Sequence, residues 1–227
     1  MPFSVVYNDI GLKEYKEAWD YQELVHKSVL KEREKNTDAA SAGMLIFCEH
    51  PHVFTLGKSG RQNNLLINEN FLKKINASYY HSNRGGDITY HGPGQIVGYP
   101  IFDLEKMKLG VKTYIHRIEE SIIQTLKEYK INASRLDGAT GVWLDTNTPK
   151  VRKICAIGVR ISRAITMHGF AFNVNTDLSY FSYINPCGLP DKGVTSLQKE
   201  LGATQELNKV KEQLKTRIAE LFNLELS

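Results

Sequence analysis

A run of β-branched and aromatic residues, broken by glycines and prolines, occupies the middle of the chain and sets narrow limits on its fold. Three segments, 87–101, 141–145 and 153–174, have the residue types of strands bounded by turns. Because the strands follow one another with little chain between them, the pattern predicts hairpins. Strands joined in this way form a mostly antiparallel sheet.

Helices are expected on both sides of this strand region. Segments 12–35, 113–129 and 207–224 space their apolar residues three and four apart among charges, as amphipathic helices do. The short apolar run 44–48 predicts a buried strand. With 227 residues and neither repeats nor a long linker, the chain is expected to form one domain over residues 1–227. The order of elements predicts a fold that mixes helices and strands (α/β), specifically of the α+β type, in which the helices pack on the sheet.

Composition excludes several classes of protein. The first ten residues have no basic segment followed by an apolar one, and no later run reaches the roughly 18 apolar residues of a membrane span. The three cysteines are too few and of odd number for a disulfide framework. These features predict a soluble cytoplasmic protein with no membrane partner. A net charge of +4 does not indicate a nucleic-acid partner, although it is compatible with docking of an acidic protein.

Residues 84–100 read RGGDITYHGPGQIVGYP and contain five glycines and two prolines. Glycines at this density allow the backbone to approach a ligand closely, but a tight hairpin with bulges explains them about as well. Arg84, Tyr90 and His91 beside this backbone favour a binding loop. The segment lacks both the glycine order and the strand-to-helix setting of a dinucleotide-binding fingerprint.

Two other local patterns give weak indications of a site. Gly57-Lys58-Ser59 resembles the end of a phosphate loop, but His52 stands where the first glycine would be needed. Cys48, His50 and His52 alternate like zinc ligands on one strand face, yet no fourth partner is evident. We therefore expect no metal, and a strand end at Pro51 with one of these histidines in a cleft.

Cys187 differs from the other two cysteines in its surroundings. It lies in Ile184-Asn-Pro-Cys-Gly-Leu189, a turn-forming sequence that favours exposure, whereas Cys48 and Cys155 lie in apolar runs and are expected to be buried. An isolated turn cysteine is more often an incidental thiol than a nucleophile. Lys153, at the start of Lys153-Ile-Cys-Ala-Ile-Gly158, would ordinarily be a solvated strand end. Neither residue decides the function alone.

Several ordered segments together resemble the lipoyl(octanoyl) transferase family, over about residues 45–200. They are Glu49-His-Pro51, Thr55-Leu-Gly57, residues 84–100, Lys153-Ile-Cys-Ala-Ile-Gly-Val-Arg-Ile-Ser162, Met167-His-Gly-Phe-Ala-Phe-Asn-Val-Asn-Thr-Asp177 and Pro186-Cys-Gly188. The resemblance implies the fold of the biotin and lipoate protein ligases, a central mixed sheet flanked by helices.

The resemblance also implies roles for individual residues. Cys187 falls on the acyl-thioester nucleophile, and Lys153 falls on the lysine that lowers the pKa of that thiol. Positions of substrate contact fall on Arg84, Gly85, Gly86, Asp87, Ile88, Thr89, Tyr90, His91, Ala156, Ile157, Gly158, Gly169, Phe170 and Ala171. Asp87 and Ile88 stand where the family varies, and His52 stands where a proline is common. Backbone N–H groups near Gly85, Gly86 or Gly158 are candidate oxyanion donors.

The function implied by the resemblance is transfer of an octanoyl group from octanoyl-acyl carrier protein to a lysine of lipoyl domains. The acceptors would be the lipoyl domains of 2-oxoacid dehydrogenases and the glycine cleavage H protein, and no cofactor would be needed. Two other interpretations remain: an ATP-dependent lipoate or biotin protein ligase, and a non-catalytic module that binds lipoyl domains or acyl carrier protein. Cys187 discriminates between them, because a ligase that forms an adenylate needs no cysteine nucleophile.

Overall fold

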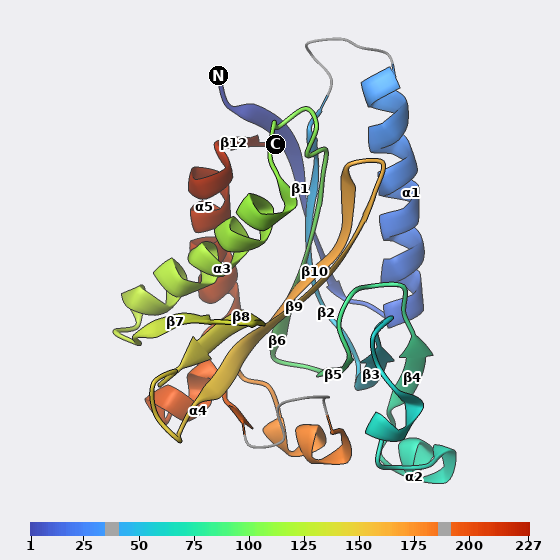
Figure 1. The fold of residues 1–227 in the computed structure, drawn as a ribbon, viewed down its shortest axis with the longest axis vertical. Coiled ribbons are helices and arrows are strands. Elements are labelled where there is room, and N and C mark those ends of the chain that lie inside the picture. Colours follow the sequence, from blue (N-terminus) through green and yellow to red (C-terminus); the bar gives the residue numbers. More distant parts are fainter. Residues whose placement is uncertain (35–40, 186–191) are drawn as a thin grey trace.

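A mixed β-sheet forms the centre of the protein. The computed structural model describes residues 1–34, 41–185 and 192–227. Within these ranges the main sheet has nine strands in the order β12-β1-β2-β6-β10-β9-β8-β7, with β11 beside β9 (Figure 1). The strands are β1 (Phe3–Leu12), β2 (Gly43–Glu49), β6 (Gln95–Phe102), β7 (Ala133–Leu136), β8 (Ala139–Leu144), β9 (Arg152–Ser162), β10 (Ile165–Asn173), β11 (Gly193–Val194) and β12 (Leu224–Leu226).

Most neighbouring strands are antiparallel, as the sequence predicts. The exceptions are the two partners of β1 and the pairing of β11 with β9, which are parallel. The hairpin of β9 and β10 closes through Arg163 and Ala164, both of which have positive φ, as a two-residue turn between twisted strands requires. This long hairpin crosses the middle of the molecule (Figure 1).

A small second sheet lies beside one end of the main sheet. It consists of β3 (Val53–Leu56), β4 (Ser78–His81) and β5 (Ile88–His91) in the order β4-β3-β5, with β3 parallel to β4 and antiparallel to β5. Helix α2 (Glu69–Lys74) and the short 3₁₀ helices η1 (Gln62–Asn64) and η2 (Leu178–Tyr183) accompany it. Phe54, Leu56, Tyr90 and Ile184 form the centre of its separate apolar cluster.

Helices cover both faces of the main sheet. Helix α1 (Tyr15–Glu34) covers one face, while α3 (Val111–Glu128) and α5 (Leu207–Phe222) cover the other; α4 (Leu197–Leu201) is a short helix after β11 (Figure 1). Successive residues of β2 serve the two faces alternately. Leu45 and Phe47 pack in the α3–α5 core, whereas Ile46 and Cys48 pack toward α1.

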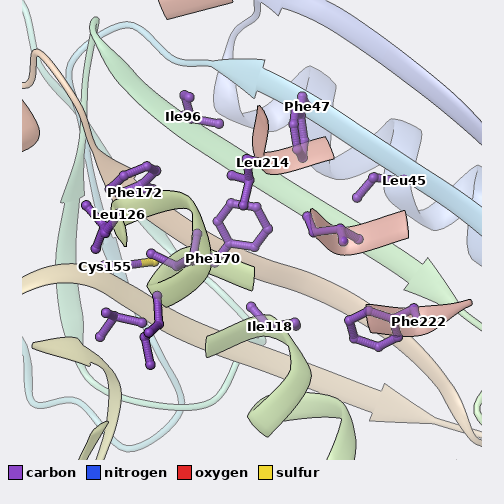
Figure 2. Packing of buried hydrophobic residues seen from close by; sticks show 14 of the residues in the cluster. Leu45, Phe47, Ile96, Ile118, Leu126, Cys155, Phe170, Phe172, Leu214 and Phe222 are labelled. Carbon is purple, nitrogen blue, oxygen red and sulfur yellow. The ribbon is translucent and has the colours of Figure 1, made fainter. Parts of the chain in front are cut away.

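The larger of the two cores lies between the sheet and helices α3 and α5. Figure 2 shows Ile118 of α3 and Leu214 of α5 beside Phe170 of β10. Burial of each large apolar side chain on this face stabilises the folded protein by about 1.5–3 kcal/mol.

None of the helices in the described ranges combines the length and apolarity needed to cross a bilayer.

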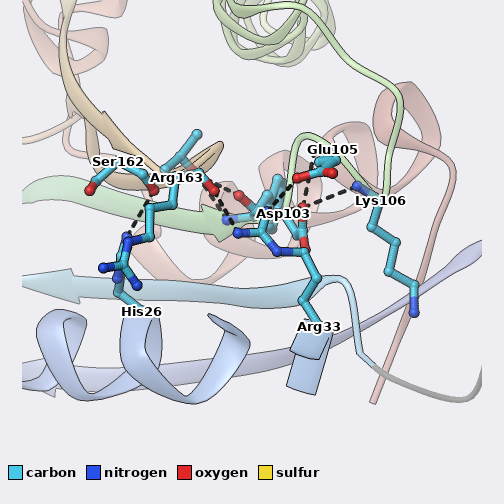
Figure 3. Close-up of polar contacts among 9 residues, drawn as sticks. His26, Arg33, Asp103, Glu105, Lys106, Ser162 and Arg163 are labelled. Atoms are coloured by element: carbon cyan, nitrogen blue, oxygen red, sulfur yellow. Dashed lines mark hydrogen bonds and ion pairs between the residues drawn. The ribbon is translucent and has the colours of Figure 1, made fainter. Parts of the chain in front are cut away.

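Polar contacts fasten the end of α1 to the turn of the central hairpin. Arg33 bonds to Glu105 Oε2 at 2.9 Å, contacts Asp103 Oδ1 at 3.4 Å and donates to the backbone oxygen of Arg163 at 2.8 Å (Figure 3). His26 Nε2 lies 3.2 Å from the backbone oxygen of Ser162. The helix therefore holds the far end of the β9–β10 hairpin in place.

The sequence analysis predicts the long helices and the central strands, and the structure confirms them with small shifts of boundary. The first helix begins at Tyr15 rather than at Leu12, because Leu12 is the last residue of β1. The sequence analysis does not predict β1, β3, β4, β7, β11, β12, α2 or α4. Most of these are short, and the parallel partners of β1 lie far away in the sequence. Periodicity within a segment carries no information about such partners.

Candidate active site

A cavity of about 760 Å³ opens where the central hairpin meets the small sheet. Its walls come from the loop before β5 and from β5, β6, β8, β9 and β10, together with Tyr15 of α1, Gly138, η2 and residues 184–185 and 192–194. Segments that lie far apart in the sequence thus form the wall of one cavity. A cavity of this size suits a small ligand or the end of a larger one.

Most of the predicted substrate-contact residues line this cavity. These are Arg84, Gly86, Asp87, Ile88, Thr89, His91, Ala156, Ile157, Gly158, Gly169, Phe170 and Ala171. The first six come from the loop before β5 and from β5 itself, and the others come from facing positions of β9 and β10. Their contact with a substrate remains a prediction.

Gly85 and Tyr90 do not line the cavity. The Tyr90 ring stacks on Tyr180 at 4.8 Å in the small-sheet cluster, and its hydroxyl lies 2.7 Å from His52 Nδ1. The Gly85 N–H donates to the backbone oxygen of Val159 at 2.9 Å, so this N–H is not available for an oxyanion. A Cβ at Gly158 would meet the Gly85 oxygen at 2.9 Å. The two glycines therefore allow the loop to rest directly on β9.

Arg84 places a buried cation at the cavity wall. Its Nη2 donates to Thr55 O at 2.6 Å and to Thr55 Oγ1 at 2.9 Å, while Nη1 donates to Gly85 O at 3.0 Å. Among the described residues, no carboxylate forms a salt bridge with it. The guanidinium keeps its positive charge among neutral oxygens, while the carboxylate of Asp87 also acts on it electrostatically. It can therefore attract the carbonyl oxygen of a bound acyl group.

Lys153, on β9, lines the same cavity. Its Nζ lies 4.4 Å from the centroid of the Trp143 ring and donates to the backbone oxygen of Thr140 at 3.3 Å. Burial is the main reason that the pKa of Lys153 is lowered. The Trp143 indole N–H donates to Ala139 O at 2.9 Å, which fixes the ring. A lysine in this setting can exchange a proton more readily than a solvated one.

Cys187 lies outside the described residues. Asn185 and Lys192, the described residues on either side of segment 186–191, both line the cavity. The other two cysteines are fully buried, as predicted, and burial raises the pKa of both thiols. Neither buried thiol can readily form a thiolate.

Neither His50 nor His52 lines this cavity, so it is not the cleft expected for one of them. His50 is buried between Lys13 O and the Tyr99 hydroxyl, at 2.6 and 2.7 Å. His52 stacks on Tyr180 at 4.2 Å. In the described ranges, no three His, Cys, Asp or Glu residues are grouped to hold a metal ion.

Two other histidines do line the cavity, and both have polar partners. His91 Nδ1 lies 2.8 Å from Gln95 Oε1, and His168 Nε2 lies 2.7 Å from Asn83 Oδ1. Burial lowers the pKa of both, that of His168 to about 3. Neutral rings of this kind hold neighbouring groups in position and are poor proton acceptors near pH 7.

Sequence reasoning missed several cavity residues, of which Trp143 is the most informative. It lies in a strand that was predicted, but its place beside Lys153 depends on the pairing of β8 with β9, where Trp143 is the direct partner of Lys153. Tyr15 and Tyr99 line the cavity from α1 and β6. An amphipathic pattern shows that such residues are buried but does not show which cavity they reach.

The buried histidines should make folding stability depend on pH. Burial lowers the pKa of His50 to about 4 and lowers those of His91 and His168 as well, whereas in the unfolded chain each is about 6.5. Below about pH 6.5 the unfolded chain therefore binds protons that the folded protein does not. Each histidine should remove up to about 1.4 kcal/mol of unfolding free energy per pH unit on acidification.

Urea unfolding at pH 7, 6 and 5 measures this loss. His168→Asn should reduce the slope, and His81→Gln, at an exposed position of β4, is the matched control that should leave it unchanged. An unfolding free energy that is constant from pH 7 to pH 5 would contradict the prediction.

Comparison with solved structures identifies the class of fold. The bipartite lipoate protein ligase of Thermoplasma acidophilum superposes with a TM-score of 0.72 over 99% of this chain and 86% of its own, at 12% sequence identity. The biotin protein ligase of Aquifex aeolicus gives a TM-score of 0.53 over 96% of this chain and 70% of its own, at 14% identity. The fold is that of the lipoate and biotin protein ligases, as the sequence analysis predicted.

Sequence comparison is more specific. Residues 14–219 match the lipoyl protein ligase A/B catalytic domain. An octanoyltransferase of Parabacteroides distasonis is 55% identical over 217 residues, which cover 95% of this chain and 97% of the relative. An octanoyltransferase of Christiangramia forsetii is 53% identical over 223 residues, which cover 96% and 95%. The chain therefore belongs to the octanoyltransferases of the lipoyl protein ligase A/B catalytic-domain family and is an acyltransferase.

Proposed function

We propose that the protein transfers an octanoyl group from octanoyl-acyl carrier protein to a lysine of a lipoyl domain, through a thioester on Cys187. The observation that carries this proposal is the placement of Lys153 in the cavity that both flanks of segment 186–191 also line. The segment contains Cys187. A two-step acyl transfer requires a thiol nucleophile and an amine that can exchange a proton, and the proposal assigns these roles to Cys187 and Lys153.

In the first step the Cys187 thiolate attacks the carbonyl carbon of the donor thioester. A new C–S bond forms, the bond to the carrier-protein sulfur breaks, and that sulfur leaves as a thiol after taking a proton from the Lys153 ammonium, which becomes the neutral amine. The nearby ammonium of Lys153 favours the thiolate before attack. One thioester replaces another, so the step is close to isoenergetic and needs no ATP.

In the second step the amine of the acceptor lysine attacks the Cys187 thioester. A C–N bond forms, the C–S bond breaks, and the amine proton passes to Lys153 in its neutral form. Formation of an amide makes this step downhill. Arg84, which is buried at the cavity wall and bonded to the two oxygens of Thr55, is assigned the role of holding the acyl oxygen.

The fold also accommodates an ATP-dependent ligase, which is the rival function. A ligase activates a free acid as an adenylate and does not use a cysteine. The identity of more than 50% with octanoyltransferases over nearly the whole chain favours the transferase.

Mass spectrometry of the intact protein tests the proposal. After mixing with octanoyl-acyl carrier protein in the absence of ATP, the protein should gain the mass of one octanoyl group, and peptide mapping should locate it on Cys187. Addition of a lipoyl domain should discharge it. Octanoate with ATP and magnesium is the control, and should give no adduct. Formation of an adenylate would support the ligase, and binding of both partners without any adduct would support a non-catalytic module.

A further inference from the structure

Trp143 carries two lysine ammonium groups at the cavity wall. Lys153 Nζ lies 4.4 Å from the ring centroid and Lys192 Nζ lies 5.7 Å from it. All three residues line the cavity. Since Lys153 is the base of the proposed transfer, a second cation on the same ring bears directly on its protonation.

Strand pairing brings Lys192 to this position. The residues that follow it form β11, which pairs with the beginning of β9, so that Gly193 opposes Arg152 and Val194 opposes Lys153. The Gly193 N–H donates to the backbone oxygen of Val151 at 3.1 Å. The indole is fixed as well, because Trp143 is 1% exposed and its N–H is bonded. Each ammonium group therefore lies over the same rigidly held ring.

The negative charges around Lys153 are directed elsewhere. Glu200 from α4 and Asp145 after β8 both bind Arg152. Glu119 from α3 binds Arg135 at 2.9 Å.

Other titratable groups near Lys153 do not neutralise its charge either. Cys155 is buried with a raised pKa and stays a neutral thiol. Among the described residues, neither Lys153 nor Lys192 forms a salt bridge. Segment 186–191, which includes Cys187 and Asp191, lies outside them.

We propose that Lys192 is a positioning residue that acts through Lys153: the charge of Lys192, held on the same Trp143 ring, favours the neutral amine of Lys153. This inference rests on the proposed function for its consequence in the reaction. A cation nearby makes it harder for a lysine to carry its own charge, just as burial does. Burial, the larger effect, and Lys192 both lower the pKa of Lys153, while Cys155 acts in the opposite direction. The amine that accepts the proton of the acceptor lysine is then present at a larger fraction near pH 7.

The effect should be measurable on Lys153 itself. In protein labelled with ¹³C-lysine, the ε-carbon signal that disappears in Lys153→Arg belongs to Lys153, and its titration gives the pKa. Lys192→Met should raise this pKa by about 0.5–1 unit, as expected for loss of one partly screened charge. Discharge of octanoyl-Cys187 to a lipoyl domain at pH 7 should slow by about three- to tenfold, because this rise in pKa lowers the fraction of neutral Lys153 by the same factor.

Three variants separate the effect of the Lys192 charge on Lys153 from disturbed folding and from a change in net charge. Lys192→Arg keeps the charge and should restore both the titration and the rate, while Lys192→Gln is a second neutral variant should the methionine disturb folding. Lys150→Met is the matched control. It removes the same net charge from an exposed position outside the cavity, and should change neither the titration of Lys153 nor the rate of discharge.

The outcomes distinguish the inference from the proposed function. An unchanged Lys153 titration in both neutral variants, or an equal shift in Lys150→Met, would overturn the inference. A shifted titration without a slower discharge would support the action of Lys192 on Lys153 and would instead count against Lys153 as the base.

Discussion

Cys187→Ser should lower the rate of octanoyl transfer by about a thousandfold or more, since the nucleophile of a covalent mechanism is lost. A serine hydroxyl does not ionise near neutral pH and has no adjacent histidine in the sequence to activate it. A lysine ammonium can stabilise a thiolate, but it does little for an alcohol of much higher pKa. The protein should still bind octanoyl-acyl carrier protein, because the cavity itself is unchanged.

Initial rates of lipoyl-domain octanoylation and the mass of the trapped adduct measure this effect. Cys48→Ala is the matched control, since it removes another thiol whose buried position gives it no access to substrate. It should retain transfer activity per folded molecule while losing some stability to the cavity that it leaves. Full activity in Cys187→Ser, or an acyl group mapped to Cys48 or Cys155, would refute the proposed nucleophile.

Lys153→Ala should give the second largest loss, about 10²- to 10⁴-fold in transfer, which is the usual contribution of a general acid–base group. Two losses combine in this variant. The Cys187 thiol loses the ammonium that favours its thiolate, so the pKa of its alkylation should rise toward the ordinary value of about 8.5. The acceptor amine also loses the group that takes its proton.

Lys153→Arg separates these two contributions. The guanidinium keeps a positive charge but does not deprotonate near neutral pH. Formation of the octanoyl adduct should therefore be slowed less than its discharge to the acceptor. The measurements are the pH dependence of Cys187 alkylation and the separate rates of acylation and deacylation in single-turnover experiments. Alkylation of Lys153→Ala with an unchanged apparent pKa would show that Lys153 does not activate the thiol.

His91 and His168 are less suited to replace Lys153 than the sequence alone suggests. Both line the cavity, but each ring is buried and bonded to an amide oxygen, of Gln95 and Asn83 respectively. Burial keeps them neutral and lowers their pKa, so that they bind a proton weakly near pH 7. Their contribution is to hold the walls of the cavity.

The local pattern of the sequence was sufficient for the elements that build the centre of the fold. The β-branched runs separated by Gly and Pro become β6, β8, β9 and β10, and the three amphipathic segments become α1, α3 and α5. These predictions hold because a strand or helix that buries one face repeats its apolar residues with the period of its own backbone. The motifs also indicated the cavity, since twelve of the fourteen predicted substrate-contact residues line it.

Only the tertiary structure decided which residues meet there. Tyr90 of β5 stacks on Tyr180 and does not line the cavity, although its neighbours Thr89 and His91 do. Trp143 faces Lys153 because β8 pairs with β9 in one register, and Lys192 joins them because β11 adds to the other side of β9. Register is set by packing across the whole sheet, and a shift of one residue would reverse every face. The sequence by itself therefore determined which chemical groups the chain supplies, whereas contacts between distant segments determined which of them act on one another.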